Sequence, residues 1–208
     1  MYPNIIEAIR YIKSANRRNT VLLTTNGTLL NRFSKALLES NVDRVIWSYR
    51  RNNFDGDSIG LLKKIGIIRL LIEETPKEEF EKWSNFPRVE VKHLHNYGGQ
   101  IDTTKWGLQT DTQDGNRYPC YHLFLAPAIR WNGEITICCN DPSGKESIGI
   151  FSNGTTLAQV WKSRRMEEIR QGHLKGEFKG LCKNCNVWKT YSDMFFSFQK
   201  KNGHPNTV

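Results

Sequence analysis

In the first half of the chain, short apolar runs alternate with segments whose apolar residues recur at helical spacing. The strand-like runs cover residues 20–24, 44–49, 67–72 and 89–94, and the helical patterns cover residues 4–12, 29–38, 58–65 and 76–83. Strands that alternate with helices over short connections form a parallel sheet with crossover helices. The sequence therefore predicts an α/β fold of about four parallel strands, either a partial (β/α) barrel or a small doubly wound sheet.

Local signals refine this prediction at three places. Asn4, with Glu7 three residues later, predicts a helix that begins just after Asn4. Thr75 is expected to cap the fourth helix, with Pro76 as its first helical residue. The run at 20–24 is almost wholly apolar, which is typical of a strand buried on both faces.

The composition changes after residue 95, where Asn96-Tyr97-Gly98-Gly99 interrupts the pattern. The following stretch is polar and rich in Thr, Asp and Gln, as in a linker or surface loop. We therefore predict a partial barrel at 1–99, a linker at 100–117, a cysteine-rich lobe at 118–190 and a tail at 191–208.

All five cysteines fall in that second half: Cys120, Cys138, Cys139, Cys182 and Cys185. Their number is odd and the N-terminus shows no signal peptide, so we expect a cytoplasmic protein with metal-binding rather than disulfide-bonded cysteines. A C-x-x-C turn holds two thiolates close together, and two further cysteines would complete a four-thiolate site. Zinc and iron–sulfur clusters both accept such a site.

Cys138 and Cys139 follow a predicted hairpin, residues 129–137, with a turn at Asn132-Gly133. The hairpin would return the chain towards Cys120. Adjacent strand residues face opposite sides, so only one of the pair is expected to face the site. The alternative is that one or both are small core side chains.

The cysteine spacing resembles the SPASM domain of radical S-adenosylmethionine (SAM) enzymes. Cys120, twelve residues, Gly133, four residues and Cys138 open the pattern, and Cys182 and Cys185 close it. The resemblance implies a small lobe with one auxiliary [4Fe–4S] cluster. Its ligands would be Cys120, Cys138, Cys182 and Cys185, with Cys139 as the alternative to Cys138. No later cysteine is present for a second cluster.

The first half is similar to the radical SAM partial barrel at Thr24-Thr25-Asn26-Gly27 and at Val42–Ser48. This resemblance implies that Ser48 lies near the SAM ribose. The C-x-x-x-C-x-x-C motif of the SAM-cleaving cluster does not occur in the sequence. We therefore expect an N-terminally truncated family member, inactive alone, that binds SAM only if a partner chain supplies the missing strands. The family implies a peptide, protein or small-molecule substrate.

Two other classes of function compete with this interpretation. A non-enzymatic structural or interaction module would bind zinc at the same thiolates. Nucleic-acid binding is suggested only by the formal charge of +9, which is spread along the chain without a recognition motif. No run of apolar residues is long enough to cross a membrane.

Overall fold

The computed structural model describes residues 4–106, 117–152 and 154–188, and the chain divides into two compact units. Unit 1 ends at Leu94 and unit 2 begins at His95. Part of the predicted linker (107–116), the end of the predicted lobe (189–190) and the predicted tail (191–208) lie outside the described residues.

Unit 1 alternates helices and strands as predicted. Its elements are α1 (Ile5–Ala15), β1 (Leu22–Thr25), α2 (Leu30–Glu39), β2 (Arg44–Ser48), α3 (Gly56–Ile65), β3 (Gly66–Leu71), α4 (Lys77–Ser84) and β4 (Val89–Lys92). Among the described residues the strands form one sheet in the order β1-β2-β3-β4, and each neighbouring pair is parallel. The predicted α/β fold with about four parallel strands is confirmed.

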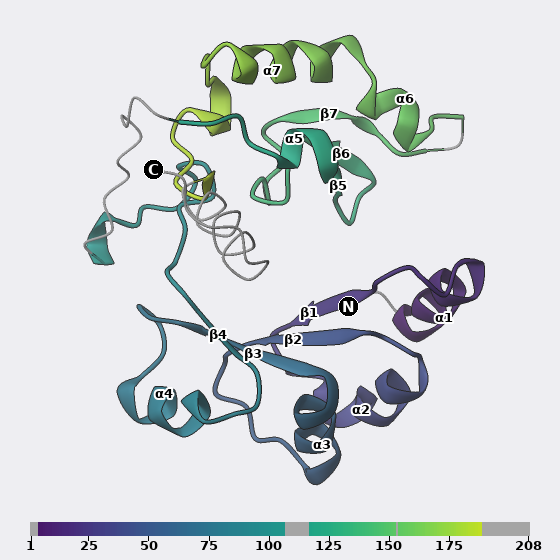
Figure 1. Cartoon of the computed structure of the whole chain (residues 1–208), viewed down its shortest axis with the longest axis vertical. Coiled ribbons are helices and arrows are strands. Elements are labelled where there is room, and N and C mark those ends of the chain that lie inside the picture. The colour runs from purple at the N-terminus through teal and green to yellow at the C-terminus, as the bar shows by residue number, and fades with distance from the viewer. Residues whose placement is uncertain (1–3, 107–116, 153, 189–208) are drawn as a thin grey trace, which may run out of the picture. The chain divides into compact units, whose positions relative to one another are not determined.

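One face of this sheet is covered by helices, and α2 and α3 lie together beneath it (Figure 1). Val45 and Trp47 of β2 and Ile68 and Leu70 of β3 are fully buried on that face. The residues that alternate with them are only half-buried or exposed. The two faces therefore differ, as expected for a sheet that packs helices on one side.

Three local predictions need correction. Strand β1 is not buried on both faces, since Leu22 is 56% exposed and β1 is an edge strand among the described residues. Helix α4 begins at Lys77 with Pro76 as its N-cap, one residue later than predicted from Thr75. Helix α3 begins at Gly56, earlier than predicted, because the side chain of Asp55 accepts a hydrogen bond from the backbone N–H of Ser58 at 2.8 Å.

The core of unit 1 is organised around Trp47. Its ring lies 4.7 Å from the ring of Phe54 and 5.0 Å from that of Trp83. Its indole N–H donates to the carbonyl of Asn26 at 3.3 Å. Gly27 has a φ of +87°, and a Cβ there would lie 2.7 Å from Trp47 Nε1. The turn after β1 therefore needs glycine both for its backbone conformation and for contact with the indole.

Unit 2 contains short elements around a small antiparallel sheet. They are η1 (Thr104–Trp106), α5 (His122–Leu125), β5 (Ala128–Ile129), β6 (Glu134–Thr136), β7 (Ser147–Ile150), α6 (Leu157–Trp161), α7 (Arg164–Leu174) and η2 (Gly180–Cys182). The predicted hairpin is present as β5 and β6, with Gly133 at φ +85° in its turn. Strand β7, which the sequence analysis did not assign, pairs antiparallel with β6.

The core of unit 2 already contains cysteines. Cys182 belongs to a buried cluster with Leu123, Ile137 and Met166, and Cys138 packs against it. None of the helices in the described ranges combines the length and apolar character that crossing a bilayer requires.

Replacing Gly27 with Ala is expected to destabilise unit 1 by about 1–3 kcal/mol, because the methyl group meets Trp47 and the backbone has a positive φ. Gly60→Ala is the matched control. Gly60 lies inside α3 with open space around it, so a gain of about 0.5–1 kcal/mol is expected. Urea unfolding followed by tryptophan fluorescence measures both. Equal midpoints for the two variants would contradict this account of the turn.

Candidate metal centre

Four of the five cysteines line a single cavity in unit 2. We call Cys120, Cys138, Cys182 and Cys185 the cavity cysteines. The other residues lining the cavity are Arg117, His122, Leu123, Asn140, Val187 and Trp188. Cys139 is exposed and does not line it. The structure thus brings together the four residues predicted as ligands and leaves out the alternative.

The β5–β6 hairpin leads the chain to Cys138 at the cavity. Strand β6 leads into Ile137, which is 2% exposed, and the chain turns directly after Cys139. The hydroxyl of Thr136 donates to the carbonyl of Cys138 at 3.0 Å, and the N–H of Asp141 donates to the same carbonyl at 3.3 Å. These bonds fix the backbone so that Cys138 faces the cavity while Cys139 faces solvent.

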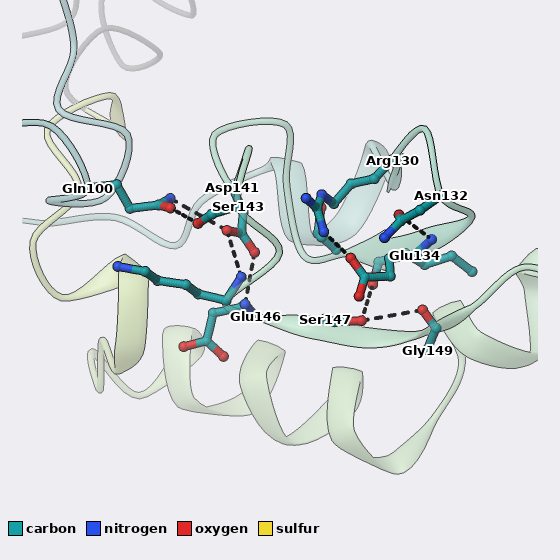
Figure 2. A network of polar contacts seen from close by, with 12 residues as sticks. Gln100, Arg130, Asn132, Glu134, Asp141, Ser143, Glu146, Ser147 and Gly149 are labelled. Atoms are coloured by element: carbon teal, nitrogen blue, oxygen red, sulfur yellow. Dashed lines mark hydrogen bonds and ion pairs between the residues drawn. The ribbon is translucent and has the colours of Figure 1, made fainter.

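Asp141 holds the loop after the two cysteines (Figure 2). Its carboxylate accepts the N–H groups of Lys145 at 3.0 Å and Glu146 at 2.8 Å. The amide of Gln100 lies 3.5 Å from Asp141 Oδ1, and Ser143 bonds to the same Gln100 side chain. Asp141 is 2% exposed and acts as a turn-forming residue. The loop that follows Cys138 is therefore closed by its own buried carboxylate.

The C-x-x-C turn is held by Asn96, which is fully buried. Asn96 Nδ2 donates to the carbonyl of Asn184 at 2.5 Å. The side-chain oxygen of Asn96 accepts the N–H of Asn186 at 3.2 Å, and the N–H of Asn96 donates to the side chain of Asn186 at 3.0 Å. The turn itself closes through a 3.4 Å bond from Cys185 N–H to the carbonyl of Cys182. Residues from both sides of the linker thus position this pair of thiols.

The two glycines after Asn96 allow this close approach. Gly98 has a φ of +69°, and a Cβ there would lie 2.9 Å from the carbonyl oxygen of Leu181. A Cβ on Gly99 would lie 3.1 Å from Cβ of Asn184. These glycines pack against the C-x-x-C turn, in addition to turning the chain.

Helices α5 and α7 position Cys120. Its backbone N–H donates to Nδ1 of His173 at 3.3 Å. Arg170 of α7 donates to the carbonyl of Leu123 at 2.8 Å, which ties the helix after Cys120 to α7. Burial lowers the pKa of His173 to about 4, with a smaller contribution from the charge of Arg117. His173 is therefore neutral at pH 7 and can accept the bond from Cys120.

Burial dominates the electrostatics of the cavity. It raises the pKa of the Cys182 thiol to about 12 and that of Cys138 further, and the neighbouring cysteines add to both shifts. Burial also raises the pKa of Cys120 and lowers that of His122. Without a metal these three thiols are protonated at pH 7. Metal binding would have to displace their protons.

The residues present suit a metal–thiolate centre in their chemistry. Thiolates bind zinc and the iron atoms of iron–sulfur clusters. In the described part of the chain, no three Cys, His, Asp or Glu side chains are gathered closely enough to hold a single ion. The cavity has a volume of about 20 Å³, which is room for about one water molecule. The cavity cysteines therefore surround a common centre without forming a tetrahedral site for one ion.

Ser48 belongs to unit 1, whereas the cavity cysteines belong to unit 2. It is half-buried at the carboxyl end of β2, next to Arg69 in the sheet register. Arg69 Nε lies 2.6 Å from Glu90 Oε2, and Lys92 lies 2.8 Å from the other oxygen. Burial raises the pKa of Glu90, but Lys92 and Arg69 outweigh this and hold it below its usual value. Ser48 thus borders a polar row on the face of the sheet where no helix of the described ranges packs, and its contact with SAM stays a prediction.

Four residues that line the cavity or support its cysteines were not found from the sequence. Asn96 and Gly98 were interpreted as a turn, and Arg117 was placed in the linker. His173 was not assigned a role in its helical pattern. Only the Asn-Tyr-Gly-Gly run carried a signal, since two consecutive glycines after an Asn can mark close packing as well as a turn.

Comparison with known proteins identifies the lobe. Residues 120–186 match the SPASM family, an iron–sulfur cluster-binding domain. This part of the chain is a SPASM domain. This confirms the resemblance found in the cysteine spacing, and the match includes all four cavity cysteines.

A protein of Treponema pallidum (strain Nichols), called an uncharacterized protein, is 32% identical to the chain over 77 residues. The aligned part is 36% of this chain and 20% of that protein, so the chain matches about one fifth of the relative's length.

The crystal structure of BtrN in complex with AdoMet and 2-DOIA matches the fold with a TM-score of 0.60. The identity is 17%, and the match covers 88% of this chain and 67% of BtrN. The chain therefore shares the fold of BtrN over most of its length.

Replacing Asn96 with Ala is expected to loosen the C-x-x-C turn. The change removes the partner of backbone groups at residues 98, 184 and 186, and the group at residue 98, which is buried, alone costs about 1–3 kcal/mol when unpaired. Each 1.4 kcal/mol of local stability lost raises the open population tenfold. Alkylation of Cys182 and Cys185 in the metal-free protein, followed by mass spectrometry, should therefore be at least tenfold faster.

Asn132→Ala is the control for this experiment. Asn132 also accepts a backbone N–H, from Glu134 at 3.2 Å, but in the exposed hairpin turn. Its loss should leave alkylation of the C-x-x-C cysteines unchanged. Equal rates in wild type and Asn96→Ala would show that Asn96 does not hold the turn.

Proposed function

We propose that the cavity cysteines hold one [4Fe–4S] cluster, and that the chain acts as the auxiliary-cluster part of a radical SAM/SPASM-type system. The observation that carries this proposal is the convergence of the cavity cysteines on one buried cavity inside a domain of an iron–sulfur cluster-binding family. The five cysteines of the chain then divide into four ligands and the exposed Cys139.

The spacing of the side chains favours a cluster over zinc. A structural zinc ion requires ligands about 2.3 Å from one point, and no three described candidates are gathered around a single ion. A cluster has four separate iron atoms, so each thiolate binds its own iron from a different side of the cavity. Thiols from three separate segments of the chain match that requirement.

When bound, such a cluster supplies one-electron transfer. Four protein thiolates would leave no iron with the open position that chelates SAM. The residues of this chain would therefore hold and insulate the centre: Leu123, Val187 and Trp188 exclude water, and the cysteines fix its position. The substrate class that we propose is a peptide, a protein or a small molecule modified by radical chemistry.

SAM binding belongs to unit 1 in this proposal. BtrN was solved with AdoMet bound, and its fold is similar to that of this chain. Ser48 would contact the ribose on the face of the sheet opposite to Trp47, where no helix packs among the described residues. The edge of β1 that has no partner strand in the described part of the chain is where a further segment, from a partner chain, would extend the sheet and complete the site.

Iron and sulfide analysis of anaerobically purified protein tests the cluster. About four irons per chain and a broad absorption band near 400 nm are expected. Cys182→Ala and Cys138→Ala should each lose most of the iron, because each removes one of four ligands. Cys139→Ala is the matched control and should retain the wild-type iron content.

Two results would overturn the proposal. A colourless protein with one tightly bound zinc would establish a structural metal module instead. Full iron retention in Cys138→Ala, together with loss of iron in Cys139→Ala, would show that Cys139 and not Cys138 is the ligand.

A further inference from the structure

Arg117 is a partly buried cation without an acidic partner in the part of the chain that the structure describes. None of the ion pairs formed there includes it, although most of the other charges near the lobe are paired. Its Nε atom is buried and makes no hydrogen bond. A guanidinium group removed from water is costly unless an opposite charge compensates it. The surroundings of Arg117 should therefore contain a negative charge.

Aromatic rings and the C-x-x-C turn fix the position of Arg117. Its guanidinium carbon lies 4.1 Å from the ring centre of Phe178 and 5.1 Å from that of Trp188. Its Nη1 donates to the carbonyl of Lys183, between the two cysteines of the turn, at 3.4 Å. Planar stacking of this kind suits arginine and not lysine. The charge is thus held at a defined place beside the turn.

The group that Arg117 faces is the set of cavity cysteines. Arg117 lines the same cavity as they do. As neutral thiols these residues offer no counter-charge. As thiolates of a metal centre they would provide it.

We propose that Arg117 is the counter-cation of the metal–thiolate centre and raises its reduction potential. This inference rests on the proposed function. A [4Fe–4S] centre with four thiolates is anionic, and one-electron reduction adds a further negative charge. A fixed positive charge stabilises the reduced form more than the oxidised form, because Coulomb attraction grows with the charge. Charge and hydrogen bonding near a cluster are established controls of its potential.

The test is a redox titration of the reconstituted full chain, with dithionite as electron donor and electron paramagnetic resonance as readout. Arg117→Gln should lower the midpoint potential. We expect the equilibrium constant for one-electron reduction of the cluster to fall tenfold, which corresponds to a decrease in midpoint potential of about 59 mV. Arg117→Lys keeps the charge and should restore most of the potential, although it loses the planar stacking.

Arg164→Gln is the matched control, because it also removes one arginine charge from unit 2. Arg164 has a side chain that is 94% exposed and paired with Glu168. Water and salt screen its charge, so its loss should leave the potential unchanged. The shift in Arg117→Gln should persist at 0.5 M salt because the charge is partly buried.

The outcomes separate this inference from the proposed function. A wild type without about four irons rejects the proposed function, whatever the variants do. A loaded wild type and a loaded Arg117→Gln with equal potentials would reject the role of Arg117. If Arg117→Gln cannot retain iron, Arg117→Lys decides: wild-type loading and potential support a role for the charge, and loss of iron in both variants rejects it.

Discussion

The hydrogen bonds between Asn96 and the residues beside the C-x-x-C turn are the contacts on which the cysteine cavity depends. Asn96 lies ninety residues before Asn186, yet each bonds to the other's backbone N–H through its side-chain oxygen. Such reciprocal pairs satisfy buried backbone groups that have no strand or helix partner. The C-x-x-C turn follows a short 3₁₀ helix that ends at Cys182, so it has little regular structure to hold it. A fully buried side chain from the other end of unit 2 provides that support instead.

Each cavity cysteine is positioned in a different way, which explains why the site needs so much of unit 2. Cys138 depends on the hairpin and on the turn closed by Asp141, while Cys120 depends on the ring of His173. Cys182 is held by packing in the apolar core and by the turn. Because metal–thiolate centres require their ligands at fixed separations, several independent supports are needed to bring distant segments together. The short elements of unit 2 are those supports.

The sequence predicted the elements and the identity of the cysteines, but not the contacts between distant residues. Strands such as β2 and β3 were found because their apolar runs are strong local signals. The predicted start of α3, at Ser58, was too late because Asp55 was not recognised as the N-cap of that helix. The exposed side of β1 was missed, since an apolar run does not reveal whether a strand lies at an edge. The sequence favoured Cys138 over Cys139 only through the family resemblance. The backbone turns that direct Cys138 to the cavity leave no periodic pattern in the sequence. Arg117 was missed because its role depends on residues more than sixty positions away.

The fixed positive charge of the cavity comes from arginine and not from histidine. His122 lines the cavity and His173 accepts a hydrogen bond from the backbone of Cys120, and burial lowers the pKa of each, so both are neutral at pH 7. Among the described residues that line the cavity, Arg117 is then the one fixed cation. A cluster bound according to the proposed function would therefore meet one fixed positive charge in this lining, the guanidinium group of Arg117.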